Sequence, residues 1–383
     1  RTSGSSGWDS RQHVSETPTH PLVPAARARR RLNPTLGKAR AMLKDFLREA
    51  GLPPHPAKPP VLLVACSGGP DSLALAETAS FFNRRGDYKV GAAVVDHGLQ
   101  PGSAGIAEAA AAKLRAMGLA PVTVHRVDVP ESGMGPEAAA RTVRYEALDA
   151  AAAAAGADAV LLGHTLDDQA EQVLLGLARG SGTRSLAGMP ARRGTYLRPF
   201  LGLRREEVEE ICAAQELDPW HDPTNADPSF ARSRVRTSVL PFLENELGPG
   251  IAEALFRSSR ILAQDADYLD AQASQTYERL RAAAGNPVNG DNPKEILLSE
   301  QALRELPPAL RQRVLALAAA ELGAARPSWE RVRAVEALLR REGSAGPVQL
   351  AGKVSAYRQV RAKPVPHGSP SYGNLVFRKK SSA

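Results

Sequence analysis

Residues 61–72 read Val-Leu-Leu-Val-Ala-Cys-Ser-Gly-Gly-Pro-Asp-Ser, an apolar run that leads directly into a glycine-rich turn. The run predicts a fully buried β-strand, and Leu75, Ala79 and Phe82 recur after the turn at helical spacing. Pro70 suits the first position of that helix, because an N–H there has no acceptor within the helix and its absence costs nothing. Glycine N–H groups before a helix N-terminus can close around phosphate oxygens, and the helix dipole favours negative charge there. The stretch therefore predicts a phosphate-binding turn.

Two commoner glycine-rich phosphate sites are absent from this sequence. It has no Gly-x-x-x-x-Gly-Lys-Ser/Thr loop and no Gly-x-Gly-x-x-Gly fingerprint. The hexapeptide 67–72 instead resembles the pyrophosphate-binding loop of the N-type ATP pyrophosphatases. Enzymes of that class split ATP between its α and β phosphates and activate an oxygen or a carboxylate as an adenylate. An ordinary turn with two glycines is the alternative interpretation.

Composition limits the classes of protein that fit. A chain of 383 residues can form two domains, and its 43% hydrophobic content includes no apolar stretch of membrane-spanning length. The formal charge of +8 suits a polyanionic partner such as nucleic acid, although an arginine-rich composition can produce it without one. Cys66 and Cys212 are too far apart in sequence for a Cys-x-x-Cys site and too few for a disulfide framework. A cytoplasmic protein is therefore expected.

Strand and helix patterns alternate between residues 61 and 217. Strands are predicted over 61–66, 90–95, 122–127 and 158–162, and helices over 71–84, 103–117, 136–155 and 166–178. This order predicts an α/β fold, a parallel sheet with helices on both faces. Ligands of such sheets bind beyond the carboxyl ends of the strands.

Polar side chains follow two of these strands where each one ends. Asp96 and His97 follow the second strand, and His164 follows the fourth. Asp168 and Glu171 share one face of the next helix, because they are three residues apart. A lone histidine at a strand end is commonly a hydrogen-bonded turn residue. Two histidines, each near a carboxylate at the ligand end of one sheet, favour a functional site.

Further short motifs follow in a fixed order and carry a closer resemblance. They are Val-Asp-His-Gly-Leu at 95–99, Pro-Glu-Ala-Ala-Ala-Arg at 136–141, Gly-His-Thr-x-Asp-Asp-Gln-Ala-Glu at 163–171, Arg-Gly-Ser-Gly at 179–182, Asp-Pro-Thr-Asn at 222–225 and Arg-Ser-Arg-Val-Arg at 232–236. Together with the turn, over residues 61–242, this set is similar to the tRNA(Ile)-lysidine synthase family.

The resemblance implies a ligase that forms a carbon–nitrogen bond. The family uses ATP to adenylate the C2 carbonyl oxygen of the wobble cytidine in a CAU-anticodon tRNA(Ile). The ε-amine of L-lysine then attacks, giving lysidine, AMP and pyrophosphate, and codon reading changes from AUG to AUA and aminoacyl identity from Met to Ile. ATP as substrate, Mg²⁺, tRNA(Ile) and L-lysine are the implied ligands, and both a monomer and a homodimer stay open.

The resemblance also implies roles for individual residues. The phosphates of ATP would be held by Ser67, Gly68, Gly69, Pro70, Asp71 and Ser72, with Asp71 also binding Mg²⁺ and with Asp96 and His97 lining the nucleotide pocket. Catalytic roles fall to Asp71, His164, Asp168 and Arg236. Substrate binding falls to Glu137, Arg141, Arg232 and Arg234.

Domain boundaries are expected at changes of composition. Residues 1–58 are predicted to be a disordered or partly helical tail, 59–245 the catalytic ATP pyrophosphatase domain, and 246–290 a linker with one long helix over 251–284. Residues 291–365 are predicted to form a small, mainly α-helical, tRNA-contacting domain, with helices over 299–322 and 327–342 and a β-like segment over 348–357. Residues 366–383 read as a basic tail.

Two other functions compete with this interpretation. A thiolase that shares the pyrophosphatase domain would generally need paired cysteines to carry sulfur, and Cys66 and Cys212 are not such a pair. A non-catalytic nucleotide-binding or RNA-binding protein would be expected to have lost the turn, His164 or Asp168, and all are intact.

Overall fold

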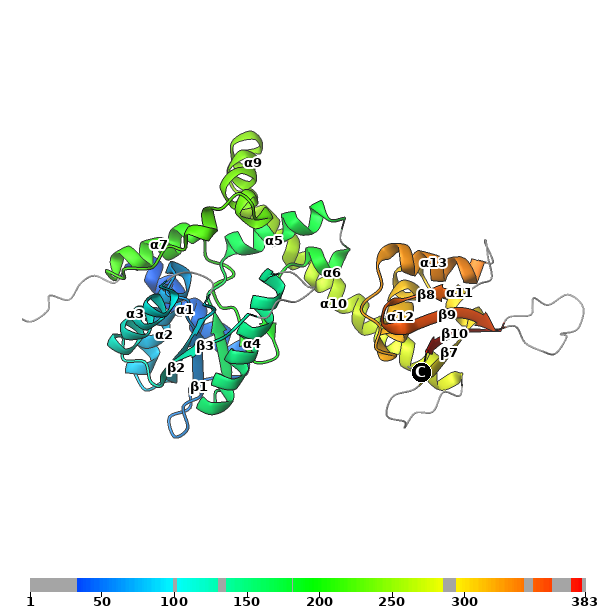
Figure 1. Cartoon of the computed structure of the whole chain (residues 1–383), viewed down its shortest axis with the longest axis horizontal. Helices are drawn as coiled ribbons and strands as arrows, with labels where there is room; N and C mark the ends of the chain where they lie inside the picture. The colour runs from blue at the N-terminus through cyan, green and yellow to red at the C-terminus, as the bar shows by residue number, and fades with distance from the viewer. Residues whose placement is uncertain are drawn as a thin grey trace, which may run out of the picture.

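The computed structural model describes residues 33–98, 102–129, 136–180, 182–284, 294–340, 347–359 and 373–380. These residues form a sheet domain and a smaller domain, connected by one long helix, α10 (Ile251–Ala283), as predicted (Figure 1). None of the helices in these ranges is long and apolar enough to cross a membrane.

A six-stranded sheet with strand order β3-β2-β1-β4-β6-β5 forms the first domain. Its strands are β1 (Val61–Ala65), β2 (Lys89–Asp96), β3 (Val122–Arg126), β4 (Ala159–Leu162), β5 (Arg192–Arg193) and β6 (Tyr196–Leu197). All neighbours pair in parallel except β5, which is antiparallel to β6. The four predicted strands are confirmed. The β5–β6 hairpin has strands of two residues, too short to show a periodic pattern.

Helices cover both faces of this sheet. They are α1 (Pro34–Glu49), α2 (Pro70–Arg84), α3 (Ser103–Ala116), α4 (Pro136–Ala155) and α7 (Arg205–Ala214). On one face Leu62 and Val64 pack with α1, α2, α3 and α7, and on the other Leu63 and Ala65 pack with α4. Because successive residues of β1 face opposite layers, the strand must be apolar throughout. The predicted α/β class is confirmed.

Helix α1 confirms that part of the predicted N-terminal tail is helical, but it packs on the sheet domain. Leu36, Leu43 and Leu47 are buried in the same apolar cluster as β1. The spacing of these leucines gives α1 one apolar face, and that face needs the sheet domain to cover it. Residues 34–49 therefore belong to the sheet domain, and residues 1–32 lie outside the described part of the chain.

A second group of helices crosses the carboxyl edge of the sheet. It comprises α5 (Leu166–Ala178), α6 (Thr183–Leu186), a 3₁₀ turn (Pro223–Ala226), α8 (Ala231–Arg234), a π-helical turn (Val235–Val239) and α9 (Leu240–Leu247). Leu166 and Ala170 of α5 share an apolar cluster with Val235, Leu240 and Ala252. This cluster fixes α5, the π-helical turn and the start of α10 together.

The smaller domain packs three helices and the end of α10 on an antiparallel sheet. Its strands, in the order β7-β10-β9-β8, are β7 (Glu295–Ser299), β8 (Val348–Gln349), β9 (Val354–Gln359) and β10 (Asn374–Lys379). Its helices are α11 (Glu300–Glu305), α12 (Pro308–Glu321) and α13 (Trp329–Arg340), with a 3₁₀ turn over Ala351–Lys353. The single helix predicted over 299–322 is two helices, because Leu306 and Pro307 have extended backbone between them.

Strand β10 corrects the predicted C-terminal tail. It pairs with both β7 and β9, and Leu375, Val376 and Phe377 are fully buried. Three consecutive apolar residues of this kind favour a strand that is covered on both faces. Residues 374–379 are therefore part of the small domain, whereas 366–372 and 381–383 lie outside the described residues.

Candidate active site

The predicted phosphate-binding turn connects β1 to α2 at the carboxyl edge of the sheet. Gly68 has a φ of +83°, and a Cβ there would lie 3.1 Å from the Cβ of Ala110. The Ser72 hydroxyl accepts a hydrogen bond from the Ser67 N–H at 3.2 Å and donates one to the Gly69 carbonyl at 3.0 Å. These bonds hold the turn against the first turn of α2. The predicted strand–turn–helix unit is confirmed.

Asp71 lies in the first turn of α2, next to this turn. Its Oδ1 is buried and has no hydrogen-bond partner among the described residues. Burial and the nearby charge of Asp168 raise the pKa of Asp71 to about 7, although Arg205 and Arg236 oppose the shift. One carboxylate together with phosphate oxygens is a usual ligand set for Mg²⁺. The residues present thus fit the predicted magnesium ion, with Asp71 as its protein ligand.

A buried cluster of two carboxylates and three arginines, the carboxylate–arginine cluster, comprises Asp168, Glu171, Arg205, Arg232 and Arg236. Asp168 Oδ1 lies 3.0–3.4 Å from a terminal nitrogen of each arginine. Glu171, which is fully buried, accepts bonds of 2.8–3.2 Å from the same three arginines. Burial would raise the pKa of Asp168, but Arg232 and Arg205 hold it below its usual range. With both carboxylates ionised, the cluster carries one net positive charge.

Four elements supply this cluster. Asp168 and Glu171 share a face of α5, and Arg205 is the first residue of α7. Arg232 and Arg236 are four residues apart on α8 and the π-helical turn, so they point the same way. Two of the predicted arginines thus join the predicted Asp168.

Arg234 does not join the cluster. It lies between Arg232 and Arg236 in sequence and therefore points away from them. Its guanidinium donates instead to the carbonyl oxygens of Pro228, at 2.6 Å, and Ser229, at 2.9 Å. Its assigned substrate-binding role remains a prediction.

His164 follows β4 directly and stands before the cap of α5. Thr165 and Asp168 form a capping box, in which the Thr165 N–H donates to Asp168 Oδ2 at 2.8 Å. Burial lowers the pKa of His164 to about 4, and the charge of Asp168 offsets this only in part. Its Nδ1 has no hydrogen-bond partner among the described residues. His164 is therefore an uncharged imidazole at neutral pH.

Asp96 and His97 end the neighbouring strand β2. Because β1 lies between β2 and β4, His97 and His164 follow the strands on either side of the phosphate-binding turn. The Gly98 N–H donates to Asp96 Oδ1 at 2.9 Å, and this bond helps hold the pKa of Asp96 low despite its burial. Burial and then Arg144 lower the pKa of His97.

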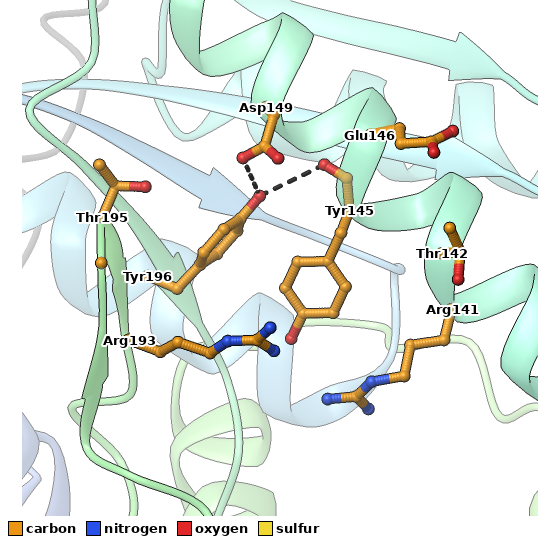
Figure 2. A pocket seen from close by; sticks show the side chains of 9 residues that line it. Arg141, Thr142, Tyr145, Glu146, Asp149, Arg193, Thr195 and Tyr196 are labelled. Carbon is orange, nitrogen blue, oxygen red and sulfur yellow. Dashed lines mark hydrogen bonds between the residues drawn. The ribbon is translucent and has the colours of Figure 1, made fainter. Parts of the chain in front are cut away.

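The predicted substrate-binding residues of α4 are Glu137 and Arg141. Glu137 is in the first turn of α4, but its side chain is outside the described set. Arg141 is exposed, lies 5.3 Å from the ring centroid of Tyr145, and lines a pocket beside the sheet edge (Figure 2). Among the described contacts, Arg141 makes none with the carboxylate–arginine cluster.

Sequence reasoning missed two members of the cluster. Sequence spacing places Glu171 on the same helix face as Asp168, but it gives Glu171 no role. That shared face was the available signal. Arg205 carries no local signal, because only the docking of α7 brings it to the carboxylates.

The two cysteines are both buried and reduced. Burial raises the pKa of the Cys66 thiol, and burial followed by the charge of Asp71 raises that of Cys212 to about 12. The Cys66 thiol contacts the Ser72 hydroxyl at 3.3 Å, and the Cys212 thiol contacts the Pro70 carbonyl at 3.5 Å. Neither thiol is ionised at neutral pH, so both behave as packing groups around the turn.

Comparison with known proteins gives matches over both domains. The PP-loop domain family matches residues 37–243, and the TilS substrate binding domain family matches residues 298–361. The tRNA(Ile)-lysidine synthase of Leifsonia xyli subsp. xyli is 50% identical over 301 residues, which is 78% of this chain and 88% of that protein. The tRNA(Ile)-lysidine synthase of Streptomyces coelicolor is 48% identical over 317 residues, 82% of this chain and 86% of that protein. Among solved structures, the U34-tRNA thiolase NcsA from Methanococcus maripaludis aligns with a TM-score of 0.48 and 20% identity, over 60% of this chain and 80% of that one.

Proposed function

The chain belongs to the tRNA(Ile)-lysidine synthase family, and from that premise we propose that it makes lysidine at the wobble position of tRNA(Ile). In the first step the C2 carbonyl oxygen of the wobble cytidine attacks the α phosphorus of ATP. An oxygen–phosphorus bond forms, the bond to the bridging oxygen breaks, and pyrophosphate leaves. In the second step the neutral ε-amine of L-lysine attacks C2, a carbon–nitrogen bond forms, AMP leaves with the oxygen, and the amine loses a proton. The modified CAU anticodon would then read AUA instead of AUG, and the tRNA would accept isoleucine instead of methionine.

The phosphate-binding turn supports the first step. Its backbone N–H groups and the N-terminus of α2 provide a site for the phosphates that leave as pyrophosphate. Asp71 would hold Mg²⁺ beside those phosphates, and the ion when bound supplies charge neutralisation to the leaving group. Ser67 and Ser72 keep the turn in the conformation that this binding needs.

The single observation that carries the proposal is the net positive carboxylate–arginine cluster close to Asp71. Negative charge builds on the α phosphate as the cytidine oxygen attacks it. Guanidinium groups that are already aligned stabilise that charge without reorganising during the reaction. Glu171 and Asp168 keep Arg232 and Arg236 aligned through bonds of 2.8–3.2 Å.

His164 supports the second step. As an uncharged imidazole it can form a hydrogen bond with the amine or with the base, and it does not repel an amine that becomes positive as it attacks. A neutral side chain here also leaves the positive charge of the site on the arginines. We therefore assign His164 to positioning of the reacting groups.

The small domain would bind the body of the tRNA. Its match to a substrate binding domain supports that role, and α10 ties it to the catalytic domain. Arg184 of α6 and Arg313 of α12 both bond to Asp270 of α10, at 2.7 and 2.8 Å. This clamp sets the small domain at a defined angle to the sheet domain.

Mass spectrometry of the wobble nucleoside tests the proposal. Purified protein with ATP, Mg²⁺, L-lysine and a CAU-anticodon tRNA(Ile) should give a nucleoside heavier by one lysine residue. Asp71→Asn should abolish the product while tRNA binding stays close to that of the wild type. A sulfur-sized shift with a thiol donor, and no lysine adduct, would favour the thiolase interpretation.

A further inference from the structure

We propose that an open pocket on the side of the sheet domain binds a backbone phosphate of the substrate RNA. This inference rests on the proposed function, because it takes tRNA as the substrate. The pocket lies between α4 and the β5–β6 hairpin and has a volume of about 490 Å³. Arg141, Tyr145, Asp149, Arg193 and Tyr196 line it, among others.

Two guanidinium groups make the pocket attractive to an anion. Arg141 comes from α4 and Arg193 from β5, and their guanidinium carbons lie 5.3 and 5.9 Å from the ring centroid of Tyr145. Figure 2 shows the two side chains pointing toward Tyr145 from opposite sides. Among the described residues, both guanidiniums contact the ring of Tyr145, and neither forms a hydrogen bond or an ion pair. Both are exposed, so their charges are available to a ligand.

The carboxylates of the pocket do not neutralise these arginines. Asp149 accepts a hydrogen bond of 2.5 Å from the Tyr196 hydroxyl. Glu146 is exposed, and in Figure 2 both acids lie on the side of the Tyr145 ring away from the guanidiniums. The pocket thus has an acidic rim and a separate basic rim, and within the described part of the chain the basic rim has no ion-pair partner.

The floor of the pocket is firmly held. The rings of Tyr145 and Tyr196 pack edge to face, with centroids 4.8 Å apart. Behind them Arg198, which is 2% exposed, donates to the Tyr145 hydroxyl at 3.4 Å and to the Pro190 carbonyl at 2.8 Å. Arg198 adds a third positive charge behind the two rings.

The geometry favours RNA over a small ligand. Guanidinium groups match the oxygens of a phosphodiester and can bind it bidentately. Proteins that recognise unpaired loops of RNA commonly combine arginine with aromatic rings, and phosphate contacts fix the register of the strand. The α-carboxylate of the amino acid substrate is the other anion that could fit, and the experiment separates the two.

The test measures tRNA affinity over a range of salt concentrations for Arg141→Gln, Arg193→Gln and the double variant. Each single change should weaken binding about tenfold, the value of one charge-assisted hydrogen bond. Each should also lower the slope of log K against log[salt] by about 0.7 to 0.9. The Michaelis constants for ATP and lysine should stay unchanged. Arg115→Gln, which removes a charge from the exposed surface of α3, should leave affinity and slope close to wild type.

Three results would overturn the proposal. The first is an unchanged affinity and slope in the double variant. The second is a higher Michaelis constant for lysine with normal tRNA affinity, which would assign the pocket to the amino acid carboxylate. The third is a loss of salt slope in Arg193→Lys as large as that in Arg193→Gln. Because Lys keeps the charge, such a loss would show that the change in tRNA binding is structural. If the wild-type protein makes lysidine but the double variant binds tRNA normally, only the role of the pocket is refuted. If the wild-type protein makes no lysidine, the proposed function is refuted.

Discussion

Replacing Glu171 by Gln tests whether the carboxylate–arginine cluster holds the site together. The two oxygens of Glu171 accept four bonds of 2.8–3.2 Å from three arginines, and the side chain is fully buried. Gln keeps the size of the side chain, but it removes the charge and turns an amide N–H₂ toward a guanidinium. Removing one partner of a buried ion pair costs about 3 to 5 kcal/mol, and we expect about 3 because Asp168 still faces the arginines. At about 2 to 4 °C per kcal/mol, the melting temperature should fall by about 6 to 12 °C.

A double-mutant cycle with Arg205→Gln shows whether the unpaired charge causes this loss. Arg205 contacts both Asp168 and Glu171, so removing it together with Glu171 restores the balance of charge. The double variant should be more stable than the sum of the single effects predicts, by about 1 to 3 kcal/mol. Urea unfolding at neutral pH, followed by circular dichroism, measures all three variants. Glu206→Gln, an exposed carboxylate in the same turn of α7, is the control and should change stability by less than about 0.5 kcal/mol.

Adenylation should also be slower in Glu171→Gln. Without Glu171, Arg232 and Arg236 lose the acceptor that fixes them, and aligned donors of this kind contribute about 10²–10³-fold to a rate. Release of pyrophosphate in a single turnover measures that rate below the melting transition. Wild-type stability and wild-type adenylation in Glu171→Gln would refute the reasoning, since the cluster would then be neither structural nor catalytic.

Other changes give independent tests. The pKa of His164 is lowered to about 4, so the native state binds fewer protons than the unfolded state between about pH 6.5 and 4. The free energy of unfolding should therefore fall by up to about 3 kcal/mol as the pH falls from 6.5 to 4. In urea unfolding at pH 7 and pH 5, His164→Gln should show less of this loss than the wild type. Gly163→Ala would place a Cβ 2.8 Å from the Asp71 carbonyl oxygen, and we expect it to displace the phosphate-binding turn and weaken ATP binding in calorimetry; unchanged ATP affinity would contradict this close approach. Asp270→Asn should raise the Michaelis constant for whole tRNA but not the value for an isolated anticodon stem-loop, because Asp270 joins Arg184 to Arg313. Asp267→Asn, which removes an exposed partner of Arg184 alone, is the control for the clamp, and equal effects on both RNA substrates would argue against it.

The core of the sheet domain could be predicted because its information is local. The run 61–66 is apolar on both faces, the turn that follows needs glycine, and α2 begins at a proline. Each of these features acts within a few residues, so each can be recognised without knowing the rest of the fold. The same holds for α5, whose capping box lies within residues 165–168.

Strand β10 shows where local information ends. Its central place depends on pairing with β7, and Arg378 lies opposite Glu295, far away along the chain. Without β7 and β9, residues 374–379 are a short apolar run with basic residues behind it, which resembles a tail. Helix α1 is similar: its periodicity predicts a helix, but its place in the sheet domain depends on other elements that cover Leu43 and Leu47.

The carboxylate–arginine cluster combines both kinds of information. The pairs Asp168 with Glu171 and Arg232 with Arg236 each share a helix face, and sequence spacing predicts that much. That the two faces meet depends on the apolar contacts that join α5 to the π-helical turn. Three arginines so close together would repel one another and scatter without the carboxylates between them. The two carboxylates therefore hold the three arginines together. We accordingly propose that Glu171 is a positioning residue, which would act on the reaction through Arg232 and Arg236.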